Sequence, residues 1–170
     1  MQLKRSLDLS LYLVTDRKLA GHRNLLEVVQ KAIKGGVTVV QLREKDLSTR
    51  EFYELGIRAK ELLPPDVPLL IDDRLDLALA IGTDGLHLGQ RDLPVEIARK
   101  LLGPPAIIGL SVENLSQLQA AKQLPVDLPG YQSGFLHPHQ NRYRTGLGAR
   151  WSENSQRIDL PAAGSHWRYK

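Results

Sequence analysis

The sequence predicts an α/β fold of the TIM (β/α)8 barrel type, here incomplete, with about five βα units followed by an aberrant C-terminal tail. Short apolar runs alternate with amphipathic segments from Leu11 to Leu124, which is typical of parallel strands buried on both faces. A polar residue ends each apolar run, as expected where chemistry lies at the carboxyl ends of several barrel strands. The sequence contains no G-x-G-x-x-G turn, which would favour a dinucleotide-binding sheet.

The expected strands and helices follow one another in strict alternation. Strands are expected at residues 11–16, 37–44, 68–73, 85–89 and 106–112. Helices are expected at residues 24–36, 48–63, 74–82, 94–102 and 114–124. Asn24 is a suitable N-cap for the first helix, and Ser48 with Glu51 forms a capping box at the second. Either Glu113 or Asn114 can cap the last helix.

The composition separates a balanced body from a basic tail. The net charge is +4, yet residues 1–130 hold 17 basic and 17 acidic side chains, and residues 131–170 hold six basic and two acidic ones. The excess charge therefore belongs to the tail and does not characterise the body. We expect a partial barrel domain at residues 1–128 and an unpatterned, poorly ordered tail at residues 129–170.

The sequence also limits the cellular context. It contains no cysteine, which excludes a disulfide framework and a cysteine-based zinc site. Its first residues lack the apolar run of a signal peptide, and no stretch approaches the roughly 20 apolar residues of a membrane span. We therefore expect a cytoplasmic protein with no membrane partner, and a homo-oligomer is compatible with the sequence.

A donor-rich cluster is expected after the second strand, where VVQL runs directly into REKD. Alternate strand side chains face opposite sides, so Gln41 and Arg43 share one face, and Lys45 continues it. If this face points to the barrel axis, the three side chains line its inner mouth and suit phosphate oxygens. The alternative, from this segment alone, is a solvated charge cluster.

Carboxylates follow the next two strands. Asp72 and Asp73 end one strand, and Gln90 and Asp92 lie just beyond the other. Adjacent strands would bring these oxygens together, and a few carboxylates with a substrate phosphate make a Mg²⁺ site. For each aspartate taken singly, the alternative is a cap on the helix that follows.

His87 and Ser111 are the remaining polar residues of the expected strands. His87 lies within its strand, where a packed, hydrogen-bonded residue is more common than a catalytic base. Ser111 ends its strand and can contact a ligand there. No base is placed near Ser111 in the sequence, so we do not assign it as a nucleophile. The sequence has no Walker motif either.

Four segments together resemble the thiamine-phosphate synthase (thiamine-phosphate pyrophosphorylase) family: LYLVTDR, AIKGGVTVVQLREKDLSTREF, LLIDDRLDLALAIGTDGLHLGQRDLP and IIGLSVEN. The resemblance covers about residues 11–128 and implies a TIM barrel. It implies an enzyme that uses Mg²⁺ to join 4-amino-5-hydroxymethyl-2-methylpyrimidine diphosphate to a thiazole phosphate. The products would be thiamine phosphate and pyrophosphate.

The resemblance also implies roles for individual residues. Gln41, Arg43 and Lys45 would hold the pyrimidine and its diphosphate, with Arg43 and Lys45 also neutralising the leaving group. Asp73 and Asp92 would hold Mg²⁺, and Ser111 would contact the substrate. Asp72 would also contact the diphosphate, but the family usually has Asn there. The negative charge of Asp72 should weaken that contact unless Mg²⁺ offsets it.

The resemblance ends after Asp127, where the family continues into a phosphate loop similar to GIGPVFPTPTKTD and later an IGGI loop. Read one base out of register, the codons from Tyr131 onward can encode Ile-Ser-Pro-Val-Phe-Ser-Thr-Pro-Thr-Lys-Thr-Asp-Thr-Gly-Leu-Gly-Leu. This suggests a single-base insertion after Asp127, in the gene or in its sequencing. Without two or three βα units the barrel would keep open parallel edges.

Two other functions fit parts of the sequence. A thiazole tautomerase-like barrel of the same pathway would share the fold, but it does not need the complete diphosphate and Mg²⁺ set. A nucleic-acid-binding module could use the basic and aromatic residues of RYRTGLGARW in the tail. The diphosphate and Mg²⁺ residues favour the synthase over both.

Resequencing the codons that follow Asp127 tests the frameshift hypothesis. We expect a neighbouring frame that restores the TPTKTD-type loop, whereas one intact frame encoding the present tail would remove the hypothesis. The 170-residue chain itself is expected to be unstable or inactive, because the lysine and the backbone amides of the family's loops are missing. Purified chain that formed thiamine phosphate at an ordinary rate would contradict this expectation.

Overall fold

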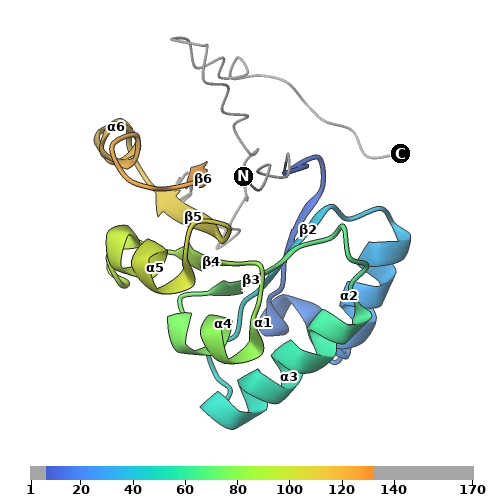
Figure 1. Ribbon diagram of the computed structural model, residues 1–170. Helices are drawn as coiled ribbons and strands as arrows, with labels where there is room; N and C mark the ends of the chain where they lie inside the picture. The colour runs from blue at the N-terminus through green and yellow to red at the C-terminus, as the bar shows by residue number, and fades with distance from the viewer. Residues whose placement is uncertain (1–6, 132–170) are drawn as a thin grey trace, which may run out of the picture.

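The computed structural model describes residues 7–131, so the tail predicted at residues 129–170 lies outside the described residues except for its first three positions. The described part is a parallel sheet covered by helices (Figure 1). The strands are β1 (Tyr12–Val14), β2 (Val39–Leu42), β3 (Leu69–Asp72), β4 (Gly85–Leu88), β5 (Ile107–Val112) and β6 (Leu128–Tyr131). The helices are α1 (Arg17–Ala20), α2 (Leu25–Lys34), α3 (Thr49–Leu62), α4 (Leu75–Ile81), α5 (Val95–Leu102) and α6 (Leu115–Ala121).

The strand order identifies the sheet as part of a barrel. The six strands pair in the order β1-β2-β3-β4-β5-β6, each parallel to its neighbour. A doubly wound sheet reverses its order at a crossover, and no reversal occurs here. Figure 1 shows the helices from α2 to α6 following one another in an arc outside the strands. The structure therefore shows an α/β half-barrel of six parallel strands, which is consistent with an incomplete barrel of the TIM type.

The two faces of the sheet have different roles. Val40 and Leu42 of β2 belong to the apolar core together with Val29 of α2 and Phe52 of α3. The alternate residues of β2 point to the opposite, inner face, where Gln41 lies buried. The helix-facing side is thus the main hydrophobic core, and the inner face is free to carry polar groups.

The helix starts follow from local side-chain chemistry. The side chain of Asn24 accepts a hydrogen bond from the backbone of Leu26 at 2.9 Å. Ser48 and Glu51 form the predicted capping box at the start of α3. Asn114, rather than Glu113, caps α6. These caps fix where each helix begins after its strand.

A repeated hydrogen bond aligns the amino ends of the strands. Thr38, which precedes β2, accepts from the backbone N–H of Leu11 at 3.0 Å. Asp84, which precedes β4, accepts from the N–H of Leu69 at 2.9 Å. The strand starts are therefore held in register pair by pair, and the carboxyl ends lie along one rim.

The sixth strand lies across the boundary that the sequence suggested at residue 128. β6 pairs with β5, and Asp127 accepts from the N–H of Ile108 at 2.9 Å and from Arg99 at 2.5 Å. These two bonds fix the start of β6. Sequence reasoning missed the strand because Pro129 argues against a strand interior, but a proline is tolerated at a sheet edge. The expectation of five strands was therefore one too few.

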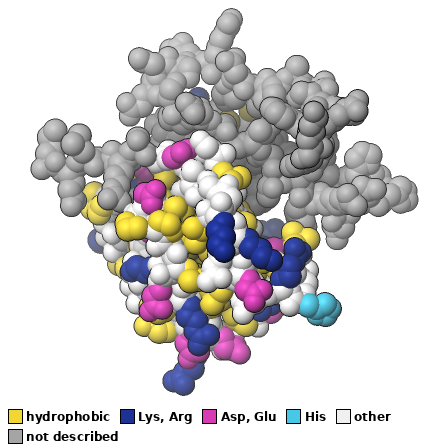
Figure 2. Space-filling view, turned by 90° about the vertical axis from the view of Figure 1, so that its right-hand side faces the viewer, with side chains coloured by type: hydrophobic (Ala, Val, Ile, Leu, Met, Phe, Trp, Pro, Cys, Tyr) yellow, Lys and Arg dark blue, Asp and Glu magenta, His cyan; other side chains and the backbone are white. Residues whose placement is uncertain are grey.

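No described helix is long and apolar enough to cross a membrane. On the face drawn in Figure 2, basic and acidic side chains are interspersed among apolar ones. That face therefore carries no extended surface of a single charge sign.

Replacing Gly85 by alanine is expected to destabilise the sheet strongly. A Cβ at Gly85 would lie 2.0 Å from the backbone oxygen of Ile107, so β4 and β5 would have to move apart. We expect Gly85→Ala to lower the free energy of unfolding by about 3 kcal/mol, as overpacked cores do, measured by urea denaturation of the full chain. Gly35→Ala is the control, since its Cβ would be 3.4 Å from the nearest atom. It should change the same quantity by about 0.5 kcal/mol or less, and equal effects of both variants would contradict the packing argument.

Candidate active site at the carboxyl ends of the strands

Asp72 lies at the centre of a polar cluster on the inner face. It ends β3 and is buried, and one carboxylate oxygen accepts from the side-chain amide of Gln41 at 2.7 Å. The hydroxyl of Tyr12 donates to the side-chain carbonyl oxygen of Gln41 at 3.0 Å. Burial, followed by the nearby charge of Asp72, raises the pKa of Tyr12, so this hydroxyl stays protonated. The chain Tyr12–Gln41–Asp72 joins β1, β2 and β3.

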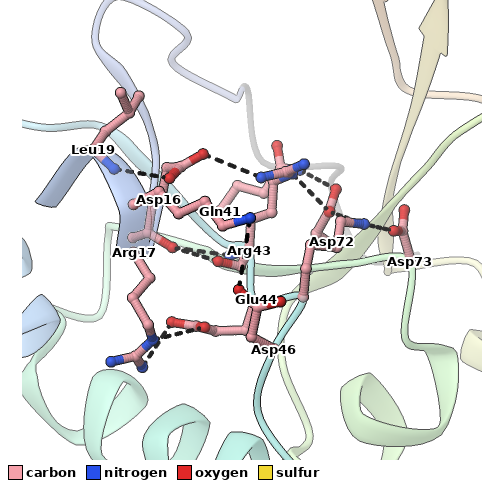
Figure 3. Close-up of polar contacts among 12 residues, drawn as sticks. Asp16, Arg17, Leu19, Gln41, Arg43, Glu44, Asp46, Asp72 and Asp73 are labelled. Atoms are coloured by element: carbon pink, nitrogen blue, oxygen red, sulfur yellow. Dashed lines mark hydrogen bonds and ion pairs between the residues drawn. The ribbon is translucent and has the colours of Figure 1, made fainter. Parts of the chain in front are cut away.

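Arg43 lies between two carboxylates that come from different strands (Figure 3). Its guanidinium is 3.4 Å from Asp72 and 3.3 Å from Asp16. The second carboxylate oxygen of Asp16 accepts from the backbone N–H of Leu19 at 3.0 Å and so caps α1. Asp16 therefore holds the Arg43 side chain next to the start of α1.

Glu44 lies in the loop after β2 and points away from Arg43 (Figure 3). Its buried carboxylate accepts two hydrogen bonds from Arg17, at 3.0 and 2.9 Å. Figure 3 shows this pair separate from the pair formed by Arg43 and Asp72. The charged residues that follow β2 therefore have two roles. Glu44 binds Arg17 within the loop, whereas Arg43 and Lys45 contact Asp72 at the carboxyl ends of the strands. The alternative of a solvated cluster does not hold for Glu44, which is buried, whereas Arg43 and Lys45 remain partly exposed.

Lys45 forms ion pairs with two adjacent carboxylates. Its ammonium is 3.1 Å from Asp72 and also contacts Asp73. Burial acts to lower the pKa of Lys45, but the hydrogen bond to Asp73 and the charge of Asp72 outweigh it. The pKa of Lys45 therefore lies above its ordinary value. Lys45 is a permanent cation at the rim.

Asp73 has a backbone conformation that places its side chain over the rim. Its φ is 59°, the only positive φ among the described non-glycine residues, in the left-handed region that aspartate tolerates better than most residues. Its backbone N–H donates to the carbonyl of His87 at 2.8 Å, which ties it to β4. No side chain caps α4, whose N-cap is Arg74. The alternative that Asp72 or Asp73 caps this helix is therefore wrong.

Asp92 lies beside Asp73 and completes a pair of carboxyl groups. It accepts from the backbone N–H of Gly89 at 2.6 Å. Burial first, and then the hydrogen bond and charge of Asp73, raise the pKa of Asp92. No side chain caps α5, so the capping alternative is wrong for Asp92 as well. The two carboxyl groups therefore lie close enough to interact.

This carboxyl pair suits a magnesium ion that also binds substrate oxygens. Mg²⁺ prefers hard oxygen ligands and commonly takes one or two protein carboxylates together with phosphate oxygens and water. Asp73 and Asp92 provide two such groups. Within residues 7–131, no group of three or more His, Cys, Asp or Glu side chains could hold a metal by itself. The donor set therefore fits a shared ion and does not fit a cage built from protein alone.

Ser111 joins the site through His87. The hydroxyl of Ser111 is 2.9 Å from Nε2 of His87, and the carbonyl of Ser111 accepts from the side chain of Gln90 at 2.6 Å. His87 is the strand partner of Asp72 in the register of β3 and β4. His87 is distant from Ser111 in the sequence, and the pairing of β4 with β5 brings the two side chains together. The expectation that His87 is packed and hydrogen-bonded is confirmed.

Three contributors to the site were not assigned from the sequence: Tyr12, Asp16 and His87. Each lies on the inner face or rim of a strand next to a predicted site residue. The register of neighbouring strands would have identified them, but a single sequence gives the alternation within a strand and not the register between strands.

Comparisons with known proteins identify the family of this chain. A family model for thiamine monophosphate synthase matches residues 11–135. The thiamine-phosphate synthase of Syntrophomonas wolfei is 54% identical over 132 residues, which are 77% of this chain and 63% of that protein. That of Desulfitobacterium hafniense is 42% identical over 161 residues, which are 94% of this chain and 78% of that protein.

A solved structure shows the same architecture. The thiamine phosphate pyrophosphorylase from Pyrococcus furiosus superposes with a TM-score of 0.67 at 40% identity, covering 75% of this chain and 61% of that chain. The chain thus spans less than two-thirds of the length of this protein and of the Syntrophomonas relative. The family match over residues 11–135 and these identities show that the chain belongs to the thiamine monophosphate synthase family.

Proposed function

We propose that this chain carries the site of thiamine-phosphate synthase chemistry, in which a pyrimidine methyl diphosphate transfers its pyrimidine group to a thiazole phosphate. The observation that carries the proposal is the convergence of two cations with Asp72, Asp73 and Asp92 at the carboxyl ends of β2, β3 and β4. A diphosphate leaving group and a bound Mg²⁺ are the ligands whose charges match such a set.

The proposed work of the chain is to hold and neutralise the diphosphate. Arg43 offers a planar set of donors, which suits two phosphate oxygens at once, and Lys45 offers a point charge on the same rim. Both cations are more than a third exposed, at 38% and 45% of their side-chain surface, so a ligand can reach them. Charge that builds on departing pyrophosphate would be stabilised by these groups.

Asp73 and Asp92 would hold the Mg²⁺ ion, which when bound supplies further charge neutralisation on the leaving group. Gln41 would face the pyrimidine, since its amide is fixed by Tyr12 and Asp72 on the inner face. Ser111 would contact the substrate from β5. No described side chain is needed as a covalent nucleophile, because the aminopyrimidine is electron-rich and can support a carbocation after the diphosphate departs.

Asp72 affects how strongly Arg43 and Lys45 would bind a diphosphate. Its carboxylate lies 3.4 Å from Arg43 and 3.1 Å from Lys45, so it already compensates part of their charge. A diphosphate would have to compete with Asp72 for both cations. The negative charge of Asp72 therefore makes a bound divalent cation more important to this chain than a neutral amide there would.

The proposal extends to small-molecule substrates, a cytoplasmic location and Mg²⁺ as the cofactor. The interspersed charges in Figure 2 favour small-molecule substrates over nucleic acid on the face drawn there. The tautomerase-like alternative has no use for the cationic rim. Measuring pyrophosphate release against aromatisation of the thiazole separates these two activities.

Binding of the pyrimidine diphosphate tests the proposal without requiring turnover. Isothermal titration of the full chain with the diphosphate and Mg²⁺ should show binding that Lys45→Gln weakens by about tenfold, since one charged contact is worth about 1.4 kcal/mol or more. Lys31→Gln, at an exposed position of α2, should leave the affinity unchanged. Absence of binding, or equal loss in both variants, would contradict the proposal.

Metal binding should depend on Asp73 and Asp92 and on pH. Mn²⁺, a paramagnetic substitute for Mg²⁺, should bind at least about tenfold more weakly to Asp92→Asn when measured by water proton relaxation. The pKa of Asp92 is raised, so protonation begins at a higher pH than for an ordinary carboxyl. Affinity should therefore fall as the pH is lowered through that raised pKa, and this pH step should be absent in Asp92→Asn.

Asp66→Asn is the matched control for the metal experiment. Asp66 is exposed and precedes β3, at the opposite end of the strand from Asp73. This variant should keep the affinity and the pH profile of the unchanged chain. Mn²⁺ affinity that is the same in all three proteins would show that the carboxyl pair is not the metal site.

A further inference from the structure

The imidazole of His87 fills a slot created by two glycines. A Cβ at Gly109 would lie 2.2 Å from Nδ1 of His87, and a Cβ at Gly130 would lie 3.4 Å from its Cε1. Gly109 is the direct partner of His87 in the pairing of β4 with β5. Neither glycine has a positive φ, so these positions provide space and not an unusual backbone. The ring thus packs closely against the backbone of β5 and β6 at these two positions.

The two ring nitrogens have different surroundings. Nε2 is 2.9 Å from the hydroxyl oxygen of Ser111. Nδ1 is the only buried side-chain nitrogen or oxygen among the described residues without a hydrogen-bond partner. A neutral imidazole carries one proton, and a buried N–H without an acceptor is the rarer and less favourable arrangement. The surroundings therefore favour the tautomer with the proton on Nε2.

This tautomer determines what Ser111 can do. When Nε2–H donates to Ser111, the serine oxygen is occupied as an acceptor and its own hydrogen remains available. A hydroxyl that is free to donate suits a phosphate oxygen or another substrate acceptor. In the opposite tautomer, Ser111 would donate to His87, as in a nucleophile and base pair, but Nδ1 has no described partner to orient such a base.

We propose that His87 is a positioning residue that directs the Ser111 hydroxyl toward the substrate by donating to it from Nε2. The proposal rests on the proposed function for the identity of the substrate, but the tautomer of His87 does not. Gly109 is needed for this positioning, because any larger side chain there would displace the imidazole ring. His87 and Gly109 therefore act on the ligand only through Ser111.

Ring nitrogen chemical shifts test the tautomer in the full chain without ligand. Two-dimensional ¹⁵N–¹H spectra of histidine-labelled protein, assigned by comparison with His87→Gln, should show a protonated Nε2 and an unprotonated Nδ1 for His87. A protonated Nδ1, or two nitrogens averaged by exchange, would overturn the proposal. This readout does not depend on the proposed function.

A double-mutant cycle tests the route through Ser111. In titrations with the pyrimidine diphosphate and Mg²⁺, His87→Leu and Ser111→Ala should each weaken binding by about fivefold, roughly one hydrogen bond. The double variant should bind as weakly as Ser111→Ala alone, because the two residues form one unit. Losses that multiply would show that His87 acts independently and would overturn the proposal.

Two further variants separate positioning from folding. In His87→Gln the side-chain amide can donate in place of Nε2, and it should recover most of the affinity. Gly109→Ala keeps the imidazole but displaces it, and it should lose affinity as His87→Leu does while far-ultraviolet circular dichroism stays unchanged. Loss in His87→Gln equal to that in His87→Leu would contradict the proposal. If the unchanged chain binds no diphosphate, the proposed function fails and the ring nitrogen shifts alone decide the role of His87.

Discussion

The buried carboxylate of Asp72 is the constraint around which the polar rim is arranged. A buried charge is strongly unfavourable unless it is paired and hydrogen-bonded, and Asp72 is satisfied from two sides by Gln41, Arg43 and Lys45. These partners all come from the end of β2, so the charge of Asp72 fixes the direction of the whole segment. The pairing also leaves the two cations partly exposed, where they remain accessible to a ligand.

The strand order turns this local pairing into a site with several contributors. Because β1 to β5 are parallel neighbours, the tips that carry Asp16, Arg43, Asp73, Asp92 and Ser111 follow one another along one rim. Side chains link Asp16 to Arg43, Lys45 to Asp73, and His87 to Ser111. Between β3 and β4 the link is the backbone N–H of Asp73, which donates to the carbonyl of His87. The contacts form a continuous path from β1 to β5. The polar contacts are thus gathered at the rim, while Val39 and Leu70 are buried further down the same face.

Sequence alone predicted the parallel strands, most of the helices and their caps, because these depend on apolar periodicity and on side chains close in the chain. It also predicted that Gln41, Arg43 and Lys45 share a face, which follows from alternation within one strand. It did not predict the contact of His87 with Ser111, since that depends on the register between β4 and β5. It missed β6 because Pro129 argues against a strand interior, and the bonds from Ile108 and Arg99 to Asp127 that support the strand exist only in three dimensions.

The account depends most directly on whether one cation and one diphosphate bind together at this rim. Crystals of the full chain grown with Mn²⁺ and pyrophosphate would locate the ion by its anomalous scattering. The account predicts an ion bound by the carboxylates of Asp73 and Asp92, with pyrophosphate oxygens on the ion and on Arg43 and Lys45. An ion held elsewhere, or pyrophosphate bound away from Arg43 and Lys45, would contradict it.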